Sequence, residues 1–315
     1  MKQVALGGSG LVSTRLVYGC MRVVGTMERG RFTPDMEEKG RRAILAAYEA
    51  GYTHFDHADI YGNGLCEEVF GRVLRDVSGM RERVVITSKC GIRWAGDPTA
   101  DAPHRWDFSR EHIVWSCEQS LRRLGVEQLD LLLLHRPDFL ADPLEIAMAF
   151  EQLRAQGKVR EFGVSNFMPS TVTMLQRACS MKLIVNQIEV HLARLTPLED
   201  GTLDQCLTEG ITPMSWSPLA RGLLGLAPGH GAPHVGLGLR LQSGKARGQQ
   251  LDAVEDGFQL RGLVHHMHGR GDLSAVVQQR RDAQFVAVAL GEFEIRQRAF
   301  RGIVCRFGQI GRAHV

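Results

Sequence analysis

Up to about Gly225, the sequence repeats one pattern, in which a short strand-like run is followed by an amphipathic helical segment. The clearest run covers residues 129–134 and is apolar except for Asp130. Strands that are apolar on both faces are typical of a parallel sheet covered by helices. We therefore predict seven parallel strands, at residues 15–20, 53–56, 84–88, 129–134, 159–164, 183–187 and 212–216.

Helices are expected between these strands, because capping residues precede several apolar stripes and glycines follow them. In two of the segments a proline stands in the first turn, where its missing N–H costs nothing. The predicted helices run from Thr33–Pro34 to Gly51, from 65 to 77, from Ser109 to Gly125, from Asp142–Pro143 to Gly157, from 169 to 179 and from 198 to 209.

A (β/α)8 barrel, the TIM barrel, is the simplest closed fold for this alternation, and 315 residues are enough for one. An open, doubly wound sheet is the alternative. Polar residues follow many of the strands, and only a barrel brings all the strand ends to one mouth. These residues are Asp56, Lys89, His135, Ser165, Asn166, Gln187 and Ser217. We predict the barrel over residues 1–225, incomplete because an eighth strand and the last helices are not recognisable.

Composition limits the other classes of protein. The net charge of +3 gives no reason to expect nucleic acid or an anionic membrane as a partner. The seven cysteines are scattered and lack CxxC spacing, which indicates reduced thiols in a cytoplasmic protein rather than zinc ligands or disulfides. The first residues lack the apolar core of a signal peptide, and no apolar run is long enough to span a bilayer.

Four residues after the second, third and fourth strands form the candidate catalytic set: Asp56, Tyr61, Lys89 and His135. Each alone is more often structural, as a loop anchor or a solvated side chain. Together they suit carbonyl reduction, in which an alkoxide must gain a proton. A phenol has an unperturbed pKa of about 10, and a neighbouring ammonium lowers that pKa. A carboxylate keeps the lysine charged, and a histidine polarises the carbonyl.

The motifs around these residues resemble the aldo-keto reductases, most closely the bacterial HADIYG/SKCGI-type oxidoreductases. The likeness covers about residues 12–225 and includes HADIYG, TSKCGI, EQSLRRLG, LDLLLLHRPD, GKVREFGVSNF, NQIEVH and PMSWSPLARG. It implies a (β/α)8 barrel that reduces an aldehyde or ketone, with Tyr61 as proton donor and Asp56, Lys89 and His135 beside it.

The same resemblance implies a nicotinamide cofactor, NADPH with NADH possible, and no metal. By position in the motifs, Ser165, Asn166 and Gln187 hold the carboxamide, and Trp216 stacks on the nicotinamide ring. Ser217 and Leu219 contribute backbone contacts near the pyrophosphate. Two further cofactor-binding residues are implied, Met21 after the first strand and Asp56 itself.

The tail, residues 226–315, differs from the rest of the chain. It is rich in Gly, Arg, Gln and His, and has 12 Lys and Arg against 7 Asp and Glu. The family's seventh helix, eighth strand and Gly-Ser-x-x-x-x-Arg segment, which grips the 2′-phosphate, are not recognisable there. We interpret the likeness of residues 243–247 to that segment, and the histidines His265, His266 and His268, as accidental. We expect a poorly ordered tail, apart from the strand-like run 285–290, which could cover the barrel's open seam.

Three functions remain open at this point. The first is an NAD(P)H-dependent reductase of a small carbonyl substrate, acting as a monomer or weak oligomer. The second is a barrel that binds the cofactor without turnover, and the third is an inactive, truncated or frameshifted product. The intact set of four residues favours the first, whereas the unrecognisable eighth strand favours the third.

The first testable prediction concerns the origin of the tail. Its last six residues, Ile310 to Val315, are what ATC GGA AGA GCA CAC GTC encodes, and that string resembles a common sequencing adapter. We expect the encoding DNA to contain this string and to show a frameshift or chimeric junction after the codon for Gly225. Reading the DNA in all frames tests this. Different codons, or an intact tail in an independent clone, would contradict it.

Overall fold

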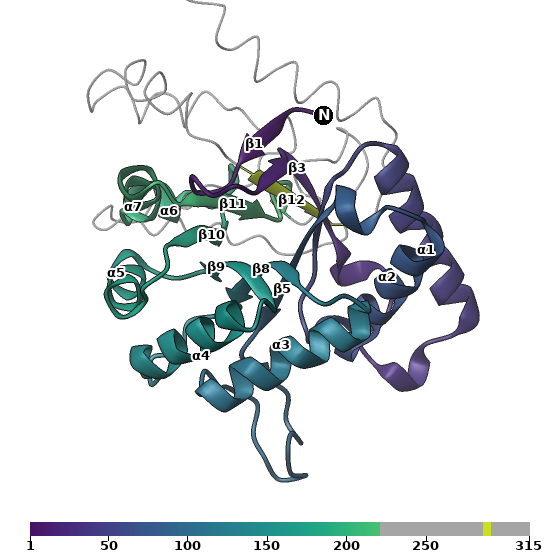
Figure 1. Cartoon of the computed structure of the whole chain (residues 1–315), viewed down its shortest axis with the longest axis horizontal. Helices are drawn as coiled ribbons and strands as arrows, with labels where there is room; N and C mark the ends of the chain where they lie inside the picture. Colours follow the sequence, from purple (N-terminus) through teal and green to yellow (C-terminus); the bar gives the residue numbers. More distant parts are fainter. Residues whose placement is uncertain (221–285, 291–315) are drawn as a thin grey trace, which may run out of the picture. The chain divides into compact units, whose positions relative to one another are not determined.

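The computed structural model describes residues 1–220 and 286–290, and in these residues eight parallel strands close into a barrel (Figure 1). The strands neighbour one another in the order β10-β11-β12-β3-β4-β5-β8-β9. Their bounds are β3 Leu16–Gly19, β4 His54–Asp56, β5 Val85–Cys90, β8 Leu129–Leu134, β9 Val159–Ser165, β10 Leu183–Glu189, β11 Thr212–Trp216 and β12 Val286–Leu290. The seven strands predicted before Gly225 are all present, with ends shifted by one or two residues.

The eighth place in the barrel is taken by β12. It pairs with β11 from Met214↔Val286 to Trp216↔Val288, and with β3 from Leu16↔Ala287 to Gly19↔Leu290. Of the two outcomes expected for the seam, open or covered by the strand-like run at 285–290, the structure shows the second. The other predictions for the tail, on its order, its histidines and residues 243–247, lie outside the described residues.

Helices lie between successive barrel strands, as the capping pattern predicts. They are α1 Pro34–Glu49, α2 Leu65–Asp76, α3 Arg110–Leu124, α4 Pro143–Ala155, α5 Pro169–Ala178, α6 Thr196–Glu199 and α7 Thr202–Glu209. The single helix predicted at 198–209 is wrong, because the chain breaks it into α6 and α7. Gly201 has a φ of 86°, which glycine adopts at little cost, and Asp200 accepts a hydrogen bond from the Thr202 N–H.

At the N-termini of three helices, the capping side chains predicted from the sequence form hydrogen bonds with the first turn. Thr33 Oγ1 accepts from the N–H of Met36 at 3.3 Å, and Ser109 Oγ accepts from the N–H of His112 at the same distance. At the start of α4, Asp142 Oδ1 accepts from the N–H of Leu144 at 2.9 Å. Each side chain satisfies one N–H that the first turn of the helix cannot pair.

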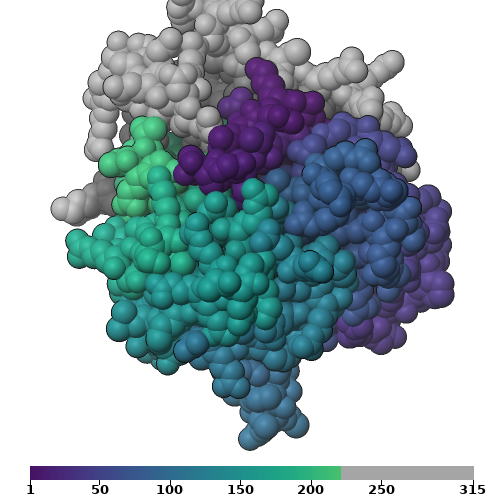
Figure 2. Space-filling view, viewed as in Figure 1, coloured from purple at the N-terminus to yellow at the C-terminus, as the bar shows by residue number. Residues whose placement is uncertain are grey.

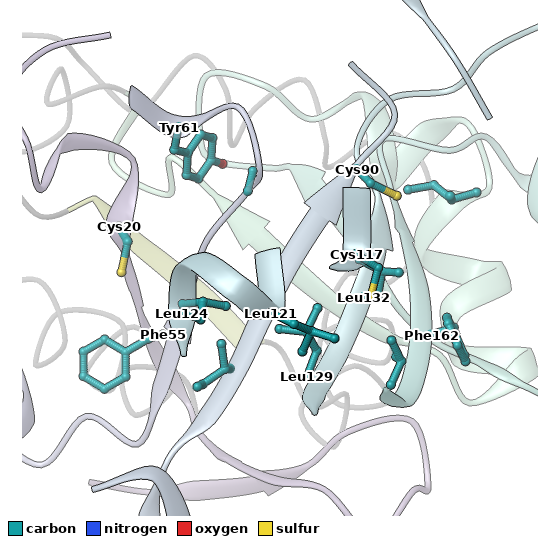
Figure 3. Close-up of a cluster of buried hydrophobic side chains, with 14 of the residues drawn as sticks. Cys20, Phe55, Tyr61, Cys90, Cys117, Leu121, Leu124, Leu129, Leu132 and Phe162 are labelled. Carbon is teal, nitrogen blue, oxygen red and sulfur yellow. The ribbon is translucent and has the colours of Figure 1, made fainter. Parts of the chain in front are cut away.

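The core has two parts, because β-strand side chains alternate between the two faces. Within β8, Leu132 and Leu134 belong to the larger cluster, and Leu131 and Leu133 to the smaller one. The larger cluster also includes residues of α2, α3 and α4, so it lies between the sheet and its helices (Figure 3).

The smaller cluster also receives the N-terminal hairpin. This hairpin joins β1 (Gln3–Ala5) to β2 (Val12–Thr14), and its Leu6 and Leu11 are buried in the cluster. The Gly7 N–H donates to Thr212 Oγ1 at 2.7 Å, and a Cβ on Gly7 would lie 2.5 Å from the backbone of Ile184. The glycine-rich residues 7–10 therefore lie in a hairpin turn that rests on the barrel.

Several short elements complete the described residues. The 3₁₀ turns are η1 Cys20–Arg22, η2 Arg29–Arg31, η3 Tyr61–Gly64 and η4 Arg81–Arg83. A second hairpin, β6 Ile92–Arg93 with β7 Arg105–Trp106, follows β5 and projects from the body of the molecule (Figure 2). None of the helices among residues 1–220 combines the length and apolarity that crossing a membrane requires.

A glycine in α2 gives a test of the helix packing. A Cβ on Gly71 would lie 2.6 Å from the carbonyl oxygens of Arg123 and Leu124. Helix propensity alone favours Gly71→Ala by about 1 kcal/mol. Overpacking against backbone costs about 1–3 kcal/mol, and here the propensity gain offsets only part of that cost. We expect Gly71→Ala to lower the free energy of unfolding, as measured by urea denaturation. The control is Gly30→Ala, which meets no atom within 4 Å. A Gly71→Ala variant as stable as the natural chain would contradict the close contact.

Candidate active site

The four predicted catalytic residues lie at the carboxyl ends of neighbouring strands. Asp56 ends β4 and Lys89 lies near the end of β5, which pairs with β4 on one side and β8 on the other. His135 directly follows β8, and Tyr61 begins η3, five residues after Asp56. Adjacent parallel strands thus bring residues from four separate sequence segments to one place.

Lys89 is the centre of this group. Its Nζ donates to Asp56 Oδ2 at 2.7 Å, to the carbonyl oxygen of His57 at 2.7 Å and to Tyr61 Oη at 3.2 Å. The side chain of Lys89 is fully buried, and that of Asp56 is nearly so. An ammonium group has three N–H donors, and each has an acceptor here.

The charge of Lys89 is maintained by its partners. Burial alone lowers the pKa of a lysine, because it penalises the charged form. The charge of Asp56 and the contacts with Tyr61 outweigh that effect, so the pKa of Lys89 is raised above its ordinary value. Lys89 is therefore a cation at neutral pH, even though it is removed from water.

The pKa of Tyr61 is set by two opposing effects, and the sequence did not predict their net result. Burial raises the pKa of its hydroxyl, and Lys89 lowers it without cancelling the effect of burial. The net pKa of Tyr61 is therefore above 10, and the expectation that the ammonium brings it below the ordinary value is wrong for the protein alone. At neutral pH Tyr61 keeps its proton. Figure 3 shows Tyr61 in the apolar cluster that includes Cys20 and Phe55, which accounts for this desolvation.

His135 completes the group beside Tyr61. The two rings meet edge to face, with 5.7 Å between their centroids. Burial first, and then the charges of Lys89 and Arg136, hold the pKa of His135 well below its ordinary value. The imidazole is therefore neutral at pH 7, with one nitrogen as donor and the other as acceptor. Its Nδ1 is buried and has no hydrogen-bond partner among the described residues.

A second group of polar side chains lies next to the first. Ser165 Oγ donates to the carbonyl oxygen of Gln187 at 3.0 Å, and Asn166 Nδ2 donates to Ser165 Oγ at 2.8 Å. Trp216 Nε1 donates to Asn166 Oδ1 at 2.9 Å. Asn166 has a φ of 63°, a conformation that asparagine tolerates better than most residues. These contacts fix the edge of the indole ring at the end of β11.

Gln187 joins the two groups. Its carbonyl oxygen accepts from Ser165 and from the N–H of Asn166, while its side-chain Nε2 donates to Asp56 Oδ1 at 2.9 Å. A primary amide carries two N–H groups and an oxygen, and these contacts use one N–H of Gln187 and one of Asn166. Such a set of amide donors and acceptors beside a partly buried indole fits a planar carboxamide and its aromatic ring.

The remaining predicted cofactor-binding residues are less directly joined to this group. Met21 lies in η1 and packs against the larger core cluster, and its carbonyl oxygen accepts from Cys66 Sγ at 3.7 Å. Ser217 is buried directly after β11 and has a φ of 49°. Leu219 is the first residue of a second unit of the chain, residues 219–283, of which only Leu219 and Ala220 are described.

Two neighbours of the site were missed by reasoning from the sequence. Arg136 lies over the ring of Trp216, with 5.3 Å from its Cζ to the ring centroid. Its position directly after His135 could have indicated that it lies in the site. Asp59 lies between Asp56 and Tyr61 in the chain with its Oδ1 buried, and was visible only as a letter of the HADIYG motif. Within the described residues, no group of three or more His, Cys, Asp or Glu side chains is arranged to hold a metal ion.

Comparisons with known proteins agree with this geometry. The oxidoreductase YcsN of Bacillus subtilis is 46% identical over 173 residues, which are 55% of this chain and 58% of the relative. The 6-dehydroglucose reductase of Agrobacterium fabrum is 37% identical over 225 residues, 71% of this chain and 73% of the relative. The match with YcsN thus spans less than two thirds of that relative's length.

The fold has solved counterparts. The glycerol dehydrogenase of Gluconobacter oxydans superimposes with a TM-score of 0.69 at 22% identity, covering 98% of this chain and 95% of that one. This likeness concerns the fold alone. The model of the Aldo/keto reductase family matches residues 15–240, beyond the end of the likeness visible in the motifs. With most of its length covered by that match, the chain belongs to the aldo/keto reductase family.

Proposed function

We propose that this protein reduces an aldehyde or ketone to an alcohol with NAD(P)H, and that Tyr61 donates the proton. The observation that supports this most is the ammonium of Lys89, which donates both to Asp56 and to the hydroxyl of Tyr61. A protonated phenol beside a fixed cation is ready to give its proton to an alkoxide, because the cation stabilises the phenolate left behind.

Each residue then has a separate task. The bound nicotinamide supplies the hydride. Tyr61 transfers its proton to the substrate oxygen, and Lys89 stabilises the resulting phenolate. Asp56 keeps Lys89 charged and aimed, since its carboxylate lies 2.7 Å from the ammonium. Neutral His135, whose ring borders that of Tyr61, donates a hydrogen bond that orients the carbonyl.

Ser165, Asn166 and Gln187 would hold the carboxamide of the cofactor, with Trp216 against its ring. Met21, Ser217 and Leu219 would add contacts along the rest of the cofactor. We propose NADPH as the cofactor, with NADH as the second choice, because the family generally uses one of these two. We propose that the site uses no metal ion.

The first substrates to assay are polyhydroxylated carbonyl compounds. The Agrobacterium relative, 37% identical over most of this chain, is named a 6-dehydroglucose reductase. In barrel enzymes the loops at the carboxyl ends of the strands decide the substrate. The hairpin of β6 and β7 follows the carboxyl end of β5 and is therefore one of these loops. It presents two exposed tryptophans, Trp94 and Trp106, with His104 between them.

Two domains are proposed, the reductase-type barrel of residues 1–225 and the tail of residues 226–315, from which β12 enters the sheet. The alternatives remain a barrel that binds cofactor without turnover and an inactive product. The buried Lys89 contacts favour the enzyme, because no binding role for a small cofactor needs an ammonium aimed at a phenol. A cofactor fluorescence titration followed by a turnover assay separates the three.

The role of Tyr61 is tested by Tyr61→Phe, which removes only the hydroxyl. We expect cofactor binding to be kept and the rate of carbonyl reduction to fall by about 10²–10⁴-fold, the usual contribution of a general acid. Tyr52→Phe is the matched control, because the ring of Tyr52 packs against that of Tyr18, with 5.9 Å between the centroids. Near-normal turnover by Tyr61→Phe would sink the assignment.

The role of the lysine is tested by Lys89→Met. The ammonium lowers the pKa of Tyr61, so its loss should raise that pKa further. Reduction needs protonated Tyr61, so activity declines as pH rises through this pKa. We expect a lower rate and a high-pH decline shifted to still higher pH. Asp56→Asn should do less, because it leaves the amine of Lys89 beside Tyr61 and weakens only the support for its charge and aim. Lys158→Met, which removes a surface partner of Glu118, is the control. An unchanged pH profile in Lys89→Met would refute the pairing.

A further inference from the structure

Asp59 is a partly buried acid to which the reaction above gives no task. It lies in the loop between Asp56 and Tyr61, just before η3. Its Oδ2 lies 2.5 Å from Ser116 Oγ on α3, and its N–H donates to the carbonyl oxygen of Lys89 at 3.1 Å. Its Oδ1 is buried and has no hydrogen-bond partner among the described residues.

These contacts join three elements of the site. The backbone of Asp59 is bonded to the same residue of β5 whose side chain holds Asp56 and Tyr61. The side chain of Asp59 attaches the loop to α3 through Ser116. Two residues further on, Tyr61 is followed by Gly62 and Asn63, both with positive φ, so the chain turns sharply there. The distance between Tyr61 and Lys89 therefore depends on where Asp59 holds the loop.

We propose that Asp59 is a positioning residue: as a neutral carboxylic acid it holds the loop of Tyr61 against β5 and α3, and its ionisation loosens that loop. The effect on reduction rests on the function proposed above, while the effect on the loop does not.

The groups around Asp59 favour the neutral form. Burial raises its pKa most; the bonds from Ser116 and from the backbone of Ile60 lower it, Glu67 raises it and Arg123 lowers it, which gives about 7. Arg123 cannot fully offset a charge on Asp59, because its Nε donates to Glu67 Oε2 at 2.6 Å. On the side of β5 and α3, burial raises the pKa values of the thiols Cys90 and Cys117, so both are neutral near pH 7. Lys89 directs its ammonium to Asp56.

Ionisation therefore creates a charge with little to stabilise it. Its Oδ1 is buried without a hydrogen-bond partner among the described residues, and the charge of Glu67 opposes a negative charge there. Such a charge is unfavourable unless water reaches it. Opening of the loop lets water in, and it also moves Tyr61 away from Lys89. We expect this opening as pH rises through about 7.

Three other groups of the site, Tyr61, Lys89 and His135, titrate away from that range. The pKa of Tyr61 and that of Lys89 are raised above their ordinary values, which are 10.0 and 10.5, and the pKa of His135 is held well below 6.5. A change near pH 7 that disappears with Asp59 therefore belongs to Asp59.

The experiment compares the full natural chain with Asp59→Asn, which keeps the shape of the side chain and is neutral at every pH. Amide hydrogen exchange of residues 57–64 is measured at pH 6 and pH 8 and corrected for the intrinsic rate at each pH. We expect the natural chain to lose protection at pH 8 and Asp59→Asn to keep it at both values. Asp76→Asn, at an exposed acid paired with Arg41, is the control and should behave like the natural chain.

The second measurement is the pH dependence of carbonyl reduction. The natural chain should lose part of its activity as pH rises through about 7, before the high-pH decline that belongs to Tyr61, and Asp59→Asn should keep that part. Exchange that is equal in the two chains at both pH values would overturn the proposal. So would a pH profile that Asp59→Asn leaves unchanged in an active enzyme. If neither chain reduces a carbonyl at any pH, the proposed function fails, and the exchange result still decides the role of Asp59.

Discussion

The ammonium of Lys89, buried without contact with water, is the interaction on which the rest of the site depends. Removing such a charge from water costs several kcal/mol even after the protein relaxes. The cost is offset only if every N–H has an acceptor, and those acceptors come from β4, from the loop after it and from Tyr61. Asp56 in turn needs a donor for its second oxygen, which Gln187 supplies from β10 across the barrel. One charge thus requires four separate segments to be in register.

The sequence predicted the barrel and much of the site because both follow local rules. Leu129 to Leu134 and the capping residues Thr33, Ser109 and Asp142 act within a few positions of themselves. What it could not predict depends on burial and on distant partners. The raised pKa of Tyr61 is set by desolvation, and Asp59 became visible only once Ser116 lay beside it. The break at Gly201 needed a backbone angle that the helical spacing of 198–209 does not record.

The place of β12 is a different kind of case. The sequence from Val286 to Leu290 predicts a strand. It does not predict that this strand pairs with both β11 and β3, because no local pattern specifies the partners of a strand. The pairing with β3 joins segments that lie near the two ends of the described chain. Closing so long a loop costs only about 0.6 kcal/mol more for each doubling of its length. It does, however, give the barrel many non-local contacts, which are associated with slow folding.

Gln187 links the hydrogen bonds around Lys89 to those around Asn166. Its main-chain oxygen holds Ser165 and Asn166, and its amide nitrogen holds Asp56. A ligand that draws the side-chain amide of Gln187 toward Ser165 and Asn166 alters the hydrogen bonding of Asp56. Through Asp56, it also alters the environment of Lys89. Thermodynamic linkage makes such an influence mutual. In the proposed function, Gln187 would therefore couple the protonation of the residues around Lys89 to the binding of a carboxamide beside Asn166.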